Sequence, residues 1–169
     1  MQFLKKLPRE KIIEILSRLF PGADPVTLRA AICLFGLSRE LSSAHERLVA
    51  SRGLSRGRFA LLMYLQTMTR EGATPTEAAE NIGVKPASVT GLTDGLEREG
   101  LVRRRPDPVD RRRTLLAITP KGEEHLKEIL PWHMAKLELL LQELSTGEKE
   151  NLVTLLDKVR RAIPEMDRP

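Results

Sequence analysis

Cysteine is almost absent from this sequence of 169 residues, in which Cys33 is the single example. One thiol cannot form a disulfide within the chain, which excludes the small secreted folds that rely on disulfides and fits a reducing cytoplasm. Histidine is also scarce, and His45, His125 and His133 lack the close spacing of metal ligands. We therefore predict no metal site and interpret the histidines as surface or packing residues.

Aromatic residues and long apolar runs are scarce as well. Aromatic residues make up 4% of the chain and hydrophobic residues 41%, so the core must consist mainly of Leu, Ile, Val and Ala. No stretch approaches the roughly 20 apolar residues of a membrane span, and the N-terminus lacks the apolar run of a signal peptide. We identify no phosphate loop, zinc-protease motif or nucleophile elbow. These absences predict a cytoplasmic protein that is not an enzyme and that needs no cofactor and no membrane.

Positive charge is in modest excess, with 28 Lys and Arg against 23 Asp and Glu, a net charge of +5 and a pI of about 9.7. A net charge of this size is weak evidence for a nucleic-acid partner. The placement of the charge is more informative. Residues 101–113 contain six arginines against two aspartates, so they carry a net charge of +4. The basic excess is therefore concentrated in one short segment.

Apolar residues recur at helical spacing in the first part of the chain. Residues 8–20 form one such helix, which we interpret as an ordinary packing helix, with a dimerisation helix as the alternative. Asp24 followed by proline predicts the start of a second helix over residues 25–51. Ser55 predicts the N-cap of a third helix, which ends near residues 70–72.

The segment 74–119 is organised differently. Thr74 and Glu77 form a capping-box pattern, T-x-x-E, and begin a short helix that Gly83 ends. A second helix is predicted from Pro86 to about Glu99. These two helices joined by a tight turn have the organisation of a helix-turn-helix.

Two strands follow the second helix, over residues 101–105 and 113–119. The segment 106–110 between them is rich in Pro and Asp and predicts a turn. A helix-turn-helix followed by a hairpin is the order of elements in a winged helix-turn-helix, in which the hairpin is the wing. The six arginines flank the tip of this wing.

Residues 120–169 return to helical spacing. The first helix of this region contains Pro131, which predicts a kink or break just before it. Ser145 and Glu148 form a second capping box, and the last helix is expected to end at Pro164.

The predicted fold class is mainly α with a small β-hairpin wing, that is, a winged helix-turn-helix with N- and C-terminal dimerisation helices. The predicted domains are residues 1–53 for the N-terminal dimerisation helices, 54–119 for the DNA-binding lobe and 120–169 for the C-terminal dimerisation helices.

The second helix of the helix-turn-helix is the predicted DNA reader, because an α-helix fits the major groove of B-DNA. Ser88 and Thr90 are short hydrogen-bonding residues near its N-terminal end, where readers of this type meet bases. Lys85 and the N–H groups of the first turn favour a phosphate contact. Arg98 lies at the far end, where we expect a contact with the DNA backbone or a salt bridge.

The wing tip provides a second predicted contact. A narrow minor groove has an enhanced negative potential that attracts an inserted arginine, and Arg111 and Arg112 are the candidates. Asp110 would hold an arginine side chain in shape through a charge-assisted hydrogen bond. Two other interpretations stay open: six arginines are also compatible with a solvated hairpin, and a winged helix can bind an acidic protein instead of DNA.

Residues 74–122 resemble the MarR family of bacterial transcription regulators. The family pattern V-T-x-x-x-D-x-L-E-x-x-G-L-V-x-R is matched from Val89 to Arg104, Asp110 and Arg112 match the D-x-R wing tip, and the closing L-T-x-x-G is matched with Ile118 in place of Leu. The resemblance covers about a third of the chain.

The resemblance implies a homodimer whose N- and C-terminal helices interleave. It also implies binding to a palindromic double-stranded DNA operator, usually as a repressor. It also implies a pocket for a small aromatic or phenolic effector. Ser88 and Thr90 would lie in the major groove and Arg112 in the minor groove.

Gly91 departs from the family pattern, because many members carry Arg at this position, so one common DNA contact is expected to be absent. Some members sense oxidants through a cysteine. Cys33, however, lies between Ile32 and Leu34, and we interpret it as a buried structural residue.

Overall fold

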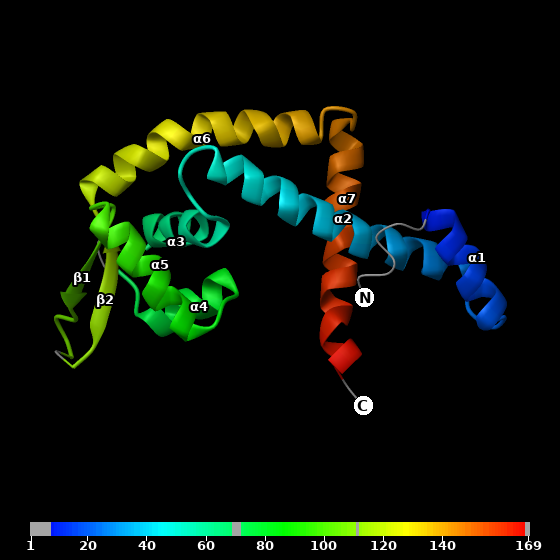
Figure 1. Ribbon diagram of the computed structural model, residues 1–169, viewed down its shortest axis with the longest axis horizontal. Coiled ribbons are helices and arrows are strands. Elements are labelled where there is room, and N and C mark those ends of the chain that lie inside the picture. The colour runs from blue at the N-terminus through cyan, green and yellow to red at the C-terminus, as the bar shows by residue number, and fades with distance from the viewer. Residues whose placement is uncertain (1–7, 69–71, 111, 168–169) are drawn as a thin grey trace. The chain divides into compact units, whose positions relative to one another are not determined.

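The computed structural model describes residues 8–68, 72–110 and 112–167 (Figure 1). The predicted class, mainly helical with a small antiparallel hairpin, is confirmed. The elements in chain order are α1 (Arg9–Leu19), α2 (Pro25–Ala50), α3 (Arg56–Thr67), α4 (Pro75–Ile82), α5 (Pro86–Arg98), β1 (Val102–Pro106), β2 (Thr114–Ile118), α6 (Pro120–Leu140), α7 (Thr146–Ala162) and a short 3-10 helix, η2 (Ile163–Asp167).

The chain forms two compact units, Met1–Phe59 and Ala60–Pro169. The first contains α1 packed against α2, and the second contains the helix-turn-helix, the hairpin, α6 and α7. No helix within the described ranges is both long enough and apolar enough to cross a bilayer. The division into three domains at residues 53 and 119 stays a prediction.

The predicted helix starts are confirmed by their hydrogen bonds. The Asp24 carboxylate accepts from the Thr27 N–H at 2.9 Å and caps α2. In the capping box of α4, the Glu77 carboxylate accepts from the Thr74 N–H at 2.8 Å, and the Thr74 hydroxyl accepts from the Glu77 N–H at 3.3 Å. The Thr74 hydrogen bonds hold the pKa of Glu77 below its ordinary value. Ser145 and Glu148 form the same arrangement at α7.

The core of the second unit joins the helix-turn-helix to the hairpin and to α6. Burying a leucine side chain stabilises a fold by about 1.5–3 kcal/mol, so residues of this kind set the relative positions of these elements. The largest fully buried side chains are leucines from α3, α5, β2 and α6, namely Leu61, Leu62, Leu65, Leu96, Leu116 and Leu126.

The hairpin is antiparallel and its register pairs Val102 with Ile118 and Arg104 with Leu116. On its other side, Leu116 exchanges two main-chain hydrogen bonds with Ala73, of 2.7 and 2.9 Å. The residue just before α4 therefore pairs with the wing and ties it to the start of the helix-turn-helix.

Several expected boundaries differ from the structure, and α3 ends at Thr67 rather than near residues 70–72. The helix α6 continues through Pro131 to Leu140, so of the predicted kink or break the break does not occur. Leu126, Ile129 and His133 lie on one side of α6 and are buried, and this packing holds the helix together where the proline removes one hydrogen bond. At the C-terminus, α7 ends at Ala162, and Pro164 lies within η2.

Gly122, in the first turn of α6, is where this helix approaches the chain just before β1. A Cβ on Gly122 would overlap the Leu101 carbonyl oxygen and lie 2.8 Å from Cγ1 of Ile118. Because main-chain atoms cannot rotate away, any side chain here must displace α6 from the hairpin.

We predict that Gly122→Ala lowers the free energy of unfolding by ~1–3 kcal/mol through this overpacking. Thermal unfolding followed by circular dichroism measures the change. Gly147→Ala is the matched control, because Gly147 lies in the first turn of α7 with open space around it, and alanine there should be neutral or stabilising by up to ~1 kcal/mol. Equal melting temperatures for the two variants would contradict the close approach.

Candidate nucleic-acid interface

The helix-turn-helix consists of α4 and α5, which pack against each other. Gly83 adopts a φ of +67°, in the left-handed region that favours glycine, and ends α4. The Val84 N–H then donates to the Ala79 carbonyl at 3.0 Å, so the turn is tight. The two helices are therefore held as one unit.

The helix α5 buries one side and exposes the other. Val89 and Leu96 are fully buried, and Thr93 between them is buried as well. Sequence reasoning missed Thr93 because threonine is usually an exposed residue. With this side fixed against the core, the opposite side of α5 must face outwards.

The four predicted contact residues of α5 all lie on exposed positions. Lys85 is the N-cap residue, Ser88 and Thr90 lie in the first two turns, and Arg98 is the last residue. The Arg98 guanidinium donates to the Asp94 carbonyl at 3.3 Å. The structure therefore makes these side chains available to a groove, and their DNA contacts stay predictions.

The wing tip is organised by Asp107, a residue that sequence reasoning did not single out. Its carboxylate accepts from the N–H groups of Val109 at 2.8 Å and Asp110 at 3.4 Å, in the manner of an Asx turn. These hydrogen bonds, chiefly the one with Val109, hold the pKa of Asp107 below its ordinary value. The Asp-Pro-Val-Asp sequence is a signal that could have identified this turn.

Asp110 and Arg112 meet within the same tip. The Asp110 carboxylate accepts from the main-chain N–H of Arg112 at 3.0 Å, so the described contact holds the backbone of the arginine. Arg112 is exposed. Arg111, the other predicted minor-groove residue, lies outside the described residues.

Arg104 and Arg113 of the wing contact the helix-turn-helix. The Arg104 guanidinium forms ion pairs with Asp94 and Glu97 of α5, at 2.6 Å for Asp94. The hydrogen bond with Asp94 is the main cause of the raised pKa of Arg104. Arg113 lies 3.7 Å from Glu77 of α4 and 3.8 Å from Asp107, so it makes longer and weaker pairs.

Shallow grooves lie along the wing. One, of about 240 Å³, is lined by Arg104, Arg105, Pro106, Arg113 and Thr114. Three of these five residues are arginines, of which Arg104 and Arg113 are paired with acidic residues of the protein.

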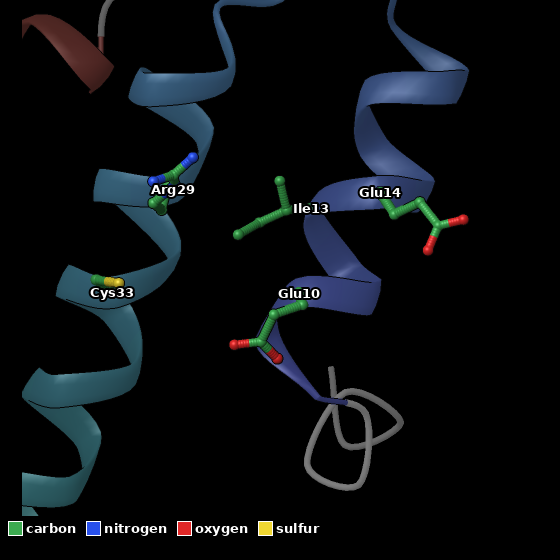
Figure 2. Close-up of a pocket in the computed structure, with 5 residues that line it drawn as sticks. All are labelled: Glu10, Ile13, Glu14, Arg29 and Cys33. Atoms are coloured by element: carbon green, nitrogen blue, oxygen red, sulfur yellow. The ribbon is translucent and has the colours of Figure 1, made fainter.

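Cys33 lies in the first unit and is exposed, so its predicted burial is wrong. Figure 2 shows it on α2 beside Arg29, facing α1 across a groove of about 510 Å³ into which Ile13 points. Neighbours in sequence point in different directions on a helix, whereas residues four apart share a side. Arg29 and Leu37, which are four residues from Cys33, are both exposed.

Residues Gly53 to Gly57 have the G-x-S-x-G spacing of a nucleophile elbow, which requires a strand before the serine and a helix after it. Here Ser55 follows helix α2 and its hydroxyl accepts from the Arg58 N–H at 3.3 Å. Ser55 therefore begins α3, as predicted, and lacks the context of a nucleophile.

Comparisons with known proteins agree with this geometry. The MarR family model matches residues 54–114. The transcriptional repressor YetL of Bacillus subtilis is 35% identical over 153 residues, which cover 90% of this chain and 92% of YetL. The transcriptional repressor MprA of Escherichia coli is 30% identical over 148 residues, which cover 88% of this chain and 82% of MprA.

A solved structure of the MarR family transcription regulator SP03579 superposes with a TM-score of 0.72 at 25% identity, over 82% of this chain and 90% of that one. The likeness to YetL extends over nearly the whole length of both proteins. The helix-turn-helix and β1 of the wing lie inside the segment that the family model matches, and β2 begins at its last residue. The chain therefore belongs to the MarR family of winged helix-turn-helix transcription regulators.

Proposed function

We propose that the protein is a homodimeric repressor that binds a palindromic DNA operator in the cytoplasm, with Lys85, Ser88, Thr90 and Arg98 of α5 and Arg111 and Arg112 of the wing as its DNA contacts. The observation that carries the proposal is the exposed side of α5 beside a wing of six arginines. The names of YetL and MprA, both transcriptional repressors, support the direction of regulation. We propose no catalytic activity.

The homodimer is supported by apolar side chains that the single chain leaves uncovered. No residue of α7 is buried, although Leu155, Leu156 and Val159 lie along one side of it and are 44–50% exposed, and Ile163, which follows the helix directly, is 52% exposed. The last part of α6 exposes Leu139 and Leu140, each 55% exposed. Apolar surface of this extent marks a protein interface, and a two-fold dimer would place two readers on the two halves of a palindrome.

The proposal includes release of the operator by a small aromatic or phenolic effector. This part rests on family membership, which implies such a ligand. An effector releases DNA only if it binds the free protein more tightly than the DNA-bound protein. A shift of the operator Kd in the presence of a phenolic compound, with no change for unrelated DNA, would support it.

Binding of the purified protein to the DNA upstream of its own gene tests the proposed function. We expect sequence-selective binding with one dimer per palindrome, and an affinity that falls steeply as salt rises, because each neutralised phosphate releases counterions. Electrophoretic mobility shift with competitor DNA measures both properties. Weak binding without sequence selectivity would instead favour the alternative interpretation, a winged helix that binds an acidic protein.

We predict that Arg112→Ala weakens operator binding by roughly 5- to 150-fold, equivalent to ~1–3 kcal/mol, through loss of the minor-groove contact. The dimer should stay intact in size-exclusion chromatography with light scattering. Arg112→Lys is the matched control, because it keeps the positive charge and loses the planar group. An unchanged Kd for the alanine variant at moderate salt would refute the contact.

We predict that Leu155→Glu converts the protein into monomers, because the substitution places a charge in the middle of the apolar side of α7. Sedimentation equilibrium measures the molecular mass. Thr154→Glu adds the same charge to the side of α7 that faces away from this stripe, and it should leave the dimer intact. A folded Leu155→Glu dimer would exclude α7 from the interface.

A further inference from the structure

The strand β1 is an outer strand of the wing, and its main-chain groups at Arg104 point away from β2. Arg104 lies opposite Leu116, whose N–H and C=O are both used by Ala73 on the other side. In an antiparallel pair, opposite residues that do not bond each other direct their N–H groups outwards. Such an edge N–H is open to water or to another strand. Here the Glu97 carboxylate accepts it at 3.1 Å.

The same arginine is also held by its side chain. One terminal nitrogen of Arg104 donates to Asp94 at 2.6 Å, and the other donates to the second oxygen of Glu97. Asp94 and Glu97 are three residues apart and therefore lie on the same side of α5. Three charge-assisted hydrogen bonds thus join one residue of the wing to the reader helix.

The position of this network links the two predicted DNA contacts. Asp94 follows Thr90 by one helical turn, and β1 leads directly from α5 to the wing tip. The two terminal nitrogens of Arg104 each donate to a carboxylate, so this guanidinium is poorly placed to bind a phosphate. Its function is therefore better explained by its protein partners than by DNA.

We propose that Arg104 is a positioning residue for operator recognition, which fixes the wing at one distance and angle from the reader helix. The inference rests on the proposed function, because it concerns how α5 and the wing contact the major and minor grooves of one operator at the same time. Asp94 and Glu97 are the partners through which Arg104 acts. A wing that moved relative to α5 would lose the register between the major-groove and minor-groove contacts.

Substitution of the two acids gives a test in which simple electrostatics and the positioning role predict opposite signs. Asp94 and Glu97 are 53% and 39% exposed, and negative charges on a DNA-facing helix repel phosphates. Removing either charge should therefore tighten DNA binding if these residues have no other role. The positioning role requires instead that Asp94→Asn and Glu97→Gln each weaken operator binding, by roughly 1.4- to fivefold for partly exposed ion pairs.

The salt dependence of binding separates positioning from a direct contact by Arg104. Loss of a phosphate contact lowers the slope of log K against log salt by about 0.9. We expect Arg104→Gln to weaken operator binding with an unchanged slope. We expect Arg104→Lys to give a smaller loss, because a lysine can pair with one of the acids. A slope lowered by about one in Arg104→Gln would overturn the proposal, since it would identify a phosphate contact.

Arg103→Gln is the matched control on the same strand. Arg103 is exposed, pairs with Ala117 and points to the opposite face of the hairpin from Arg104. The variant therefore removes one positive charge from β1 and leaves the contacts with Asp94 and Glu97 in place. In a double-mutant cycle, a loss of operator binding for the acid variant combined with Arg104→Gln that is smaller than the sum of the two separate losses would support one shared network. Fully additive effects would contradict it.

A measurement on the free protein completes the test. Glu97→Gln replaces the charged acceptor of the Arg104 N–H, so the exchange of this amide with solvent should become faster, as followed by NMR. Unchanged exchange together with operator binding equal to or tighter than wild type would overturn the positioning role. If the wild-type protein selects no palindrome, the proposed function fails and the positioning role fails with it, whereas failure of the acid variants alone leaves the repressor intact.

Discussion

The burial of one side of α5 is the constraint on which the rest of the interface depends. Val89, Thr93 and Leu96 are packed against the core, so the rotation of the helix about its axis is fixed. That rotation decides which residues face outwards, and it leaves Ser88 and Thr90 exposed. The turn at Gly83 and the close approach at Gly122 then hold this helix between α4, the hairpin and α6. The packing of the core therefore determines which side of α5 is exposed.

Acidic residues have a structural task in this basic lobe. Asp107 shapes the wing tip through two main-chain N–H groups, and Glu77 caps α4. Asp94 and Glu97 hold Arg104. Each of these carboxylates accepts hydrogen bonds from groups of the protein itself. A DNA-binding surface can therefore contain several negative charges without repelling its ligand, provided that each one is bonded to the protein itself.

The sequence predicted those features that depend on near neighbours in the chain. The capping boxes at Thr74 and Ser145 involve residues three positions apart, and both were confirmed, as was the end of α4 at Gly83. The order of helices and strands could also be predicted, because each element has its own apolar period. The helix-turn-helix and the wing were therefore recognisable before any coordinates were known.

Features that depend on tertiary contacts were missed. Arg104 and Asp94 are ten residues apart and on different elements, so the spacing of residues along the chain did not predict their ion pair. The exposure of Cys33 and the continuity of α6 through Pro131 follow from which side of a helix finds a partner. The spacing of apolar residues indicates which side of a helix is apolar, but it does not indicate which other element packs against that side.

The exposure of α7 has a consequence for how the protein responds to its own abundance. A helix of 17 residues that has no buried residue within its own chain is only marginally stable in water by itself. In the proposed dimer its stability comes from the second subunit, so the free energy of unfolding depends on the concentration of protomers. At low copy number the chain would lose both its partner and part of its folded structure, and newly made subunits would protect one another from proteolysis. The same apolar stripe would then set a lower limit on the amount of repressor that a cell can keep.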